Sequence, residues 1–282
     1  MNLKAVRYIS VLAIISVALI ATACSSGPEP PKAGTPAYSW LAAKETYATG
    51  DYQRTLEHLD AVCRTQNEFT ARAQVWELIM SSGMAKSYMD LADYFEFGSR
   101  ARPMNPGQFR RFMSDYRTYA SRLSLQFAQL FQDFEKNNKD AKITFDFPFP
   151  DGTALPSPMI TKIGNGDMPQ SAVMDDIRRQ HLKTGVVLQT CRALGFPEDT
   201  AKAHELFKAQ SVQVPRETFM LAMATALYDQ AQLFGRAKLD QPDRLKLFDG
   251  HALDLVKGLP QSKETTALTA KIQKSLKLVN AK

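Results

Sequence analysis

Cysteine and histidine are the residue types in this chain that could act as nucleophiles, bases or metal ligands. The 282 residues include Cys24, Cys63, Cys191, His58, His181, His204 and His251. No two histidines lie three or four residues apart, and no Cys-x-x-Cys or His-Glu-x-x-His pattern occurs, so no zinc site is predicted. Neither the Gly-x-Ser-x-Gly motif nor a phosphate-binding loop occurs. The sequence therefore predicts no enzyme, no metal and no cofactor, and a Cys191–His181 nucleophile would have to be assembled by the fold.

Cys24 differs from the other cysteines because it directly follows an apolar run. Lys4 and Arg7 form a short positive region, residues 9–20 are apolar apart from two serines, and small residues lead into the cysteine. This layout is typical of a secretory signal peptide. The stretch resembles the lipobox of bacterial lipoproteins, with Ala21 at the position where leucine is commonest. The resemblance implies that residues 1–23 are a removed signal peptide and that lipid on Cys24 holds the protein on a membrane.

Two other interpretations of this segment are a membrane-spanning anchor and a cleaved signal for soluble export. The apolar length of about 12–16 residues is shorter than the roughly 20 that a spanning helix needs. Ser25, directly after Cys24, resembles the outer-membrane sorting signal of Gram-negative lipoproteins. We therefore expect a lipid-anchored protein of the cell envelope, on the outer membrane facing the periplasm if the source is Gram-negative.

The residues after Cys24 predict a tether and a mildly charged body. Residues 25–36 contain four prolines, two glycines and no large apolar side chain, so residues 24–36 are expected to be a flexible tether. The net charge is +6, and two of these charges belong to the expected signal peptide. This excess of positive charge is small for a chain of this length, so the sequence predicts no nucleic-acid partner.

Cys63 and Cys191 remain after lipidation of Cys24. Each follows a leucine at helical spacing, Leu59 in one case and Leu188 in the other, which places both on apolar helix faces. In an oxidising compartment such a pair is a disulfide candidate. The alternative is that each thiol is a small buried apolar group in its own half of the chain.

Residues 37–137 predict an N-terminal helical region. Gly50 divides residues 37–66 into two helical stretches, and Asp51 can cap the second one. The stretch resembles one tetratricopeptide repeat. The positions that match the repeat pattern are Ala43, Tyr47, Gly50, Asp51, Tyr52, Leu59 and Val62. The resemblance implies an antiparallel helix pair. A second pair is expected at residues 69–80 and 85–97, separated by a turn at Ser81, Ser82 and Gly83.

Residues 107–136 predict one long helix, because they contain no proline and carry aromatic residues at spacings of three and four. We expect this aromatic stripe to be a core spine, and a ligand-binding groove is the alternative. Four arginines alternate with the aromatic residues and form a candidate interaction surface: Arg110, Arg111, Arg117 and Arg122. A solvated basic face is the simpler interpretation of these arginines.

Residues 138–169 are rich in proline and glycine and predict an irregular excursion with one short hairpin. Residues 170–282 predict further helices, beginning near Ser171, Pro197, Pro215, Pro242 and Ser262. The expected fold is therefore all-α, built from antiparallel helix pairs. With no chemical motif, we expect a helical protein-interaction scaffold with an envelope protein as partner. The alternative is a periplasmic ligand-binding module with an aromatic-lined cavity.

Overall fold

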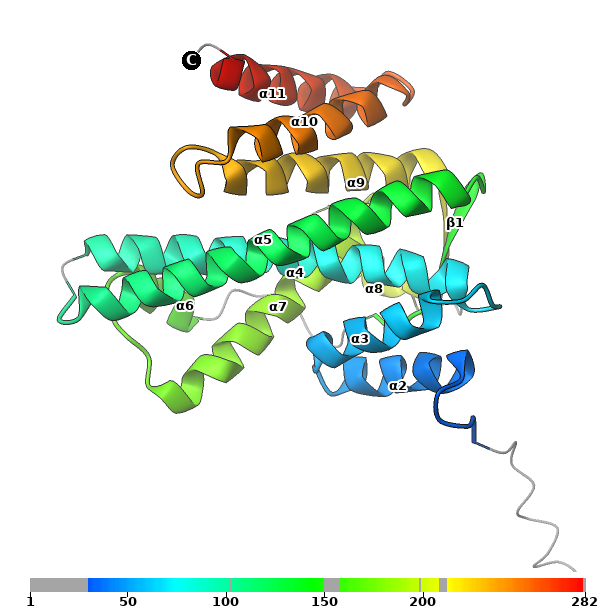
Figure 1. Cartoon of the computed structure of the whole chain (residues 1–282), viewed down its shortest axis with the longest axis horizontal. Coiled ribbons are helices and arrows are strands. Elements are labelled where there is room, and N and C mark those ends of the chain that lie inside the picture. The colour runs from blue at the N-terminus through cyan, green and yellow to red at the C-terminus, as the bar shows by residue number, and fades with distance from the viewer. Residues whose placement is uncertain (1–29, 102, 150–157, 198, 208–211, 281–282) are drawn as a thin grey trace, which may run out of the picture.

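The computed structural model describes residues 30–101, 103–149, 158–197, 199–207 and 212–280, and it confirms an all-α fold for them. These residues form ten α-helices, one short 3-10 helix and one pair of short strands (Figure 1). The expected signal peptide, Cys24 and the first part of the tether lie outside the described residues. Among the helices that are described, none is both long enough and apolar enough to cross a membrane.

Helices α2 (Pro36–Ala48) and α3 (Tyr52–Cys63) form the predicted N-terminal pair. Gly50 has a φ of +77°, a backbone conformation that glycine adopts without steric cost, and it ends the first helix. The Asp51 side chain caps α3 by accepting a hydrogen bond from the backbone N–H of Arg54 at 3.3 Å. Leu59 and Val62 are buried on the inner face of α3.

The expected second helix pair is wrong, because residues 70–100 form one continuous helix, α4 (Thr70–Arg100). Ser81 and Ser82 donate their hydroxyl hydrogen bonds to the carbonyls of Glu77 and Leu78, at 2.7 and 2.6 Å. These bonds satisfy the buried hydroxyl groups inside the helix, so the serines do not form a turn.

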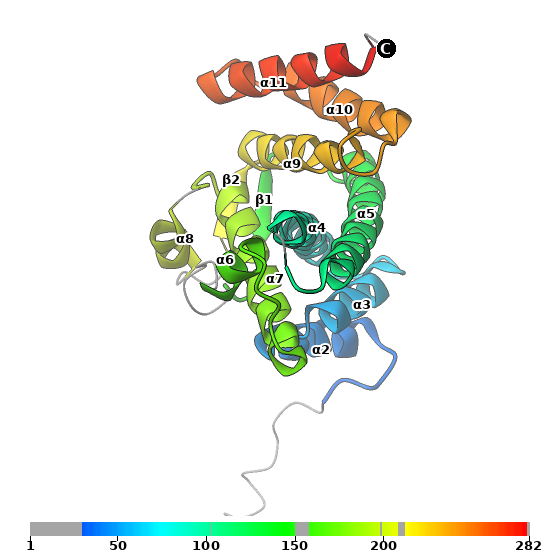
Figure 2. The same ribbon diagram turned by 90° about the vertical axis from the view of Figure 1, so that its left-hand side faces the viewer.

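Helix α4 runs through the centre of the molecule (Figure 2). It is surrounded by α5 (Pro106–Asn137), α7 (Ser171–Ala193), α9 (Arg216–Ala231) and β1 (Lys142–Phe145). Gly83 of α4 meets Gly185 of α7, where a Cβ added at Gly83 would lie 2.6 Å from the Gly185 carbonyl oxygen. The Ser87 hydroxyl donates a hydrogen bond of 2.8 Å to the carbonyl of His181 across the same contact. Gly83 therefore allows α4 and α7 to approach closely. It does not separate one helix at residues 69–80 from another at residues 85–97.

Helix α5 (Pro106–Asn137) confirms the long helix predicted from the aromatic stripe. Its aromatic residues pack mainly into the core. Phe127, Phe131 and Phe134 are fully buried, and Phe112 packs at a tilt against Phe95 of α4 with ring centroids 5.1 Å apart. The stripe is therefore a core spine, and Tyr119, at 39% exposure, is its main exposed member.

The excursion contains a strand and a short helix, but its strand does not form a local hairpin. Strand β1 (Lys142–Phe145) pairs antiparallel with β2 (Val212–Pro215), so that Lys142 lies opposite Pro215. The apolar residues Ile143, Phe145 and Phe147 are buried, as their alternation predicted. Helix α6 (Pro158–Gly164) follows, and Gly166, with a φ of +96°, forms the predicted turn after it.

The C-terminal helices follow the predicted order. They are α7, α8 (Thr200–Phe207), α9 (Arg216–Ala231) with the short 3-10 helix η1 (Gln232–Phe234), α10 (Pro242–Lys257) and α11 (Lys263–Asn280). Helix α8 begins at Thr200 instead of Pro197, because Asp199 caps it through the N–H of Lys202. Leu188, expected to face inward on α7, is 42% exposed.

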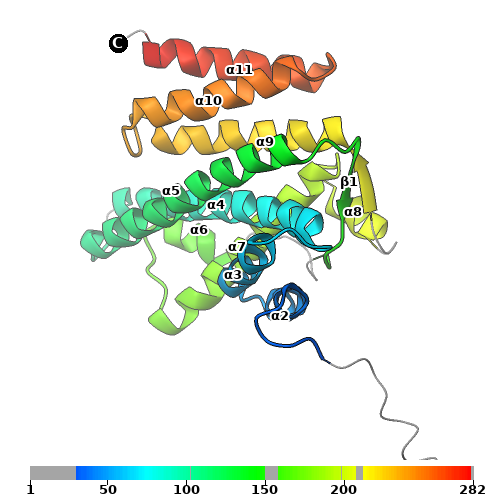
Figure 3. The ribbon, with the colours of Figure 1, turned by 45° about the vertical axis from the view of Figure 1, so that its right-hand side comes forward.

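The two helical regions share one hydrophobic core, which extends from Trp40 in α2 to Ile272 in α11. Helix α9 lies between the α4–α5 layer and α10, which explains why its sequence is apolar on nearly every side. Helices α10 and α11 form the outermost layer above α9 (Figure 3).

Candidate binding groove

Two adjoining hollows, of about 340 and 640 Å³, lie between the α2–α3 turn and α7. Both are lined by Thr49, Gly50, Tyr52 and Arg179. Because four tyrosines line them, we call the combined surface the tyrosine groove. Its main lining side chains are Tyr47, Tyr52, Tyr88, Tyr119, Phe149, Arg122, Asp175, Asp176, Arg178, Arg179, Gln180 and Lys183.

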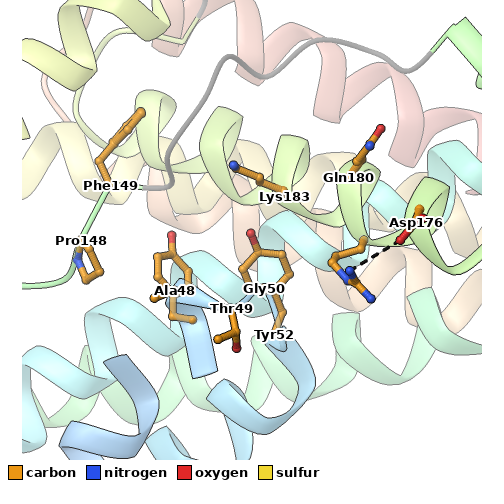
Figure 4. A pocket seen from close by; sticks show the side chains of 11 residues that line it. Ala48, Thr49, Gly50, Tyr52, Pro148, Phe149, Asp176, Gln180 and Lys183 are labelled. Atoms are coloured by element: carbon orange, nitrogen blue, oxygen red, sulfur yellow. Dashed lines mark ion pairs between the residues drawn. The ribbon is translucent and has the colours of Figure 1, made fainter. Parts of the chain in front are cut away.

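The turn at Gly50 positions one wall of the groove and α7 positions the other. In Figure 4, Gln180 and Lys183 on α7 lie opposite Tyr52, and Phe149 closes one end. The aliphatic stem of Arg179 packs over the turn, and its Cδ would lie 3.2 Å from a Cβ added at Gly50. Glycine is therefore favoured at position 50 by its positive φ, and a side chain there would also press on Arg179.

The tyrosines offer neutral hydroxyl groups to the groove. Burial raises the pKa of Tyr52 to about 12, and burial also raises the pKa of Tyr47 well above its ordinary value. Burial raises the pKa of Tyr88 as well, although the charge of Arg178 opposes this increase. The Tyr47 hydroxyl is buried and has no hydrogen-bond partner. This hydroxyl therefore keeps an unused capacity to donate a hydrogen bond.

The charged residues of the groove leave two cations unpaired. Each acidic residue that lines it already has an arginine partner: Asp51 with Arg54 at 3.5 Å, Asp175 with Arg178 at 2.8 Å and Asp176 with Arg179 at 3.5 Å. Arg122 lies over the ring of Tyr119, 5.6 Å from its centroid. Among the described residues, neither Arg122 nor Lys183 has a carboxylate partner, so the groove favours an anionic group.

The structure separates the four arginines of the predicted interaction surface. Arg122 lines the tyrosine groove, whereas Arg110 and Arg111 are exposed near the start of α5, with Arg111 3.9 Å from Asp115. Arg117 does not belong to an exposed surface. Its side chain is 11% exposed and forms an ion pair of 2.8 Å with Glu96, because it lies on the side of α5 that packs against α4.

The candidate disulfide is not formed, since Cys63 and Cys191 are both free thiols in the structure. Cys191 is fully buried in α7, whereas Cys63 is half-buried beside Glu77 of α4. Burial raises the pKa of Cys63 to about 12 and that of Cys191 to about 11. The two thiols are therefore protonated and unreactive, which agrees with the alternative of two separate buried groups.

The structure does not bring His181 and Cys191 together as a nucleophile and its base. His181 and Cys191 lie ten residues apart on α7, which corresponds to about 15 Å along a helix. His251 instead contacts Glu135 at 2.6 Å, and buried His181 has no hydrogen-bond partner at either ring nitrogen. Within the described residues, no three histidine, cysteine, aspartate or glutamate side chains come together as metal ligands.

Gly50→Ala is expected to lower the free energy of unfolding by about 1 kcal/mol or more, because alanine is strained at a positive φ. The added Cβ would also press on Arg179. Chemical denaturation measures the loss. Gly50→Asn is the matched control, since asparagine tolerates this φ while keeping the Cβ, and it should recover part of the loss. Equal stability of the alanine variant and the unchanged protein would contradict the prediction.

The sequence predicts Arg122 as an interaction residue, and Tyr47 and Tyr52 as repeat-like positions, but it does not predict the groove. No motif in the sequence links Arg178, Arg179 or Lys183 to these residues. The polar residues of α7 line the groove because the α2–α3 turn packs against this helix. This packing is a tertiary contact, which the local sequence pattern does not specify. Comparison of the chain with protein-family models, with curated proteins and with solved structures finds no match in any of the three.

Proposed function

We propose that this protein is a lipid-anchored helical scaffold of the cell envelope, and that its tyrosine groove binds an extended, acidic segment of a partner protein. The observation that carries the proposal is the pair of cations without carboxylate partners, Arg122 and Lys183, in a groove lined by neutral tyrosines. The activity proposed is binding, with no catalytic step.

The lining of the groove suits a polypeptide segment. Tyrosine side chains provide large, rigid contact surfaces with a hydroxyl at one end, and tyrosine and arginine are enriched where proteins contact partners. The combined hollows are long enough to run from Phe149 at one end to Tyr119 and Arg122 at the other. An aspartate or glutamate of the partner would pair with Lys183 or Arg122, and its backbone carbonyls would accept hydrogen bonds from the tyrosines.

The expected lipid on Cys24 supplies the location in this proposal. A proline-rich tether before α2 would hold the helical body near the membrane while leaving the groove accessible. The buried aromatic side chains of α5 pack into the core, which is why we favour a scaffold over the alternative of an aromatic-lined ligand cavity.

Site-specific photo-crosslinking in the native envelope tests the proposal. A photoreactive residue at Gln53 or Gln180, both exposed in the groove, should capture one discrete protein. The same residue at Gln273, exposed on α11, is the matched control and should not capture it.

Charge reversal then tests the chemistry of recognition. Lys183→Glu should reduce the yield of crosslinked partner from the photoreactive residue at position 53 at least tenfold, because it places a carboxylate against the acidic segment. Lys257→Glu, on the exposed face of α10, makes the same charge change outside the groove and should leave the yield unaltered. Equal yields at Gln53, Gln180 and Gln273, or an unaltered yield with Lys183→Glu, would refute the groove as the binding surface.

A further inference from the structure

A second hollow, of about 910 Å³, lies at the opposite end of the fold from the α2–α3 pair. It is enclosed by the end of α9 with η1, the start of α10 and the last turns of α11. A volume of this size falls in the range of small-molecule sites, roughly 300–1,000 Å³. No residue of the tyrosine groove lines it, so any binding here is separate from the proposed scaffold function.

The floor of this hollow is apolar. Phe234 and Leu245 are buried at its base, and Tyr228 and Val279 add partly buried apolar surface. Leu278, 64% exposed, adds open apolar surface at the rim. Apolar surface left open inside a concavity marks a place where an apolar ligand gains by leaving water.

The rim of the hollow is cationic. Four basic side chains from three segments converge on it: Arg236 after η1, Lys246 on α10, and Lys271 and Lys274 on α11. Within the part of the chain that the structure describes, none of the four forms an ion pair with a carboxylate. Asp240 and Asp243 also line the hollow, which leaves the lining with more positive than negative charges.

An apolar floor beneath a basic rim is the chemistry that recognises an amphiphile with a negative head. We propose that the hollow between α9, α10 and α11 binds a single-chain anionic lipid, with the acyl chain on Tyr228, Leu278 and Val279 and the head group between Lys246, Lys271 and Lys274. A carboxylate or a phosphate supplies the same charge, so the class includes fatty acids and lysophospholipids.

Photolabelling of the full-length protein tests this site. A diazirine derivative of a long-chain fatty acid should label peptides containing residues 228–246 and 271–279. Unlabelled oleate should compete, and so should an oleoyl lysophosphatidate if the head-group requirement is charge alone. Oleyl alcohol, which has the same chain without the charge, should compete at least tenfold less well. Each methylene removed from the acyl chain of the competing acid should weaken its competition with the label about fourfold.

Variants separate the head-group contact from the chain contact. Lys271→Glu with Lys274→Glu should weaken competition by oleate at least tenfold and leave that by oleyl alcohol unaltered. Lys263→Glu with Lys277→Glu makes the same charge change on α11 outside the hollow and is the matched control. Leu278→Asp should weaken both competitors, and because Leu278 is already exposed, the fold should tolerate the change.

Three results would overturn the proposal. One is labelling that maps outside these two peptide ranges, and another is equal competition by oleate and oleyl alcohol. The third is labelling lost whenever phospholipid vesicles are removed, which would mean that the surface binds membranes instead of single lipid molecules.

Discussion

Gly185→Ala is expected to destabilise the fold by about 3 kcal/mol, because it separates the two helices that cross at the centre of the molecule. A Cβ at position 185 would lie 2.0 Å from the Ser87 hydroxyl oxygen and 2.3 Å from the Gly83 carbonyl oxygen. Carbonyl oxygens belong to the backbone and cannot rotate away, so α7 must shift. Overpacking of this kind typically costs about 1–3 kcal/mol, and the hydrogen bond from Ser87 to His181 would be lost with it.

Thermal and chemical denaturation measure this effect. For a protein of this size, about 3 kcal/mol corresponds to a melting temperature roughly 6–12 °C lower. Gly250→Ala is the matched control, since Gly250 is also helical and no atom lies within 4 Å of its added Cβ. That variant should gain about 0.5–1 kcal/mol from helix propensity. Similar behaviour of the two variants would show that α4 and α7 do not meet at these glycines.

Glu77→Gln is expected to make the protein more stable at alkaline pH. Glu77 lies on α4 with 1% exposure, and both of its carboxyl oxygens are buried. Burial, and then the charge of Asp60, raise the pKa of Glu77 to about 8, although nearby Gln126 and Cys63 lower it in part. The folded protein therefore holds a proton on Glu77 at pH values where the unfolded chain has released it.

The sign of the pH dependence follows from this difference. The unfolded carboxyl titrates near 4.5 and the folded one near 8, so this contribution to stability is complete below pH 4.5. It is lost as the pH rises towards 8 and is constant above that value. A shift of this size corresponds to at most about 5 kcal/mol. Glutamine has the same shape without the titration, so Glu77→Gln should remove most of this loss.

Denaturation curves at pH 5, 7 and 9 check the prediction. The stability of Glu77→Gln relative to the unchanged protein should rise across this series by several kcal/mol. Glu57→Gln removes an exposed carboxylate from α3 and is the control, with little expected change at any pH. A constant difference between Glu77→Gln and the unchanged protein at all three pH values would exclude the buried carboxyl as the cause.

Local patterns predicted most of the helices. The Gly50–Asp51 signal, the aromatic spacing of α5 and the prolines before α9 and α10 depend on near neighbours in the chain, and each marks an element correctly. The Ser81-Ser82-Gly83 signal failed because these residue types serve equally in a turn and in a tight helix crossing. Which role applies depends on Gly185, about a hundred residues further on.

The binding sites were harder to predict for the same reason. Arg117 and Arg122 lie five residues apart on α5, yet one forms a buried ion pair with Glu96 and the other lines the groove. Their difference arises from the neighbours of α5, which no spacing rule within α5 specifies. Strand β1 similarly finds its partner near residue 212, so a search for a local hairpin could not identify it.

The central position of α4 has a consequence for how the chain reaches its final state. During synthesis, α4 is complete well before α7 and α9, which cover much of its surface. Until those helices arrive, the faces of α4 that they cover stay open to water, including the contact surface around Gly83 and Ser87. Delayed contacts of this kind slow folding and leave apolar surface open to aggregation. The central helix therefore stays incompletely covered until the last third of the chain has been made.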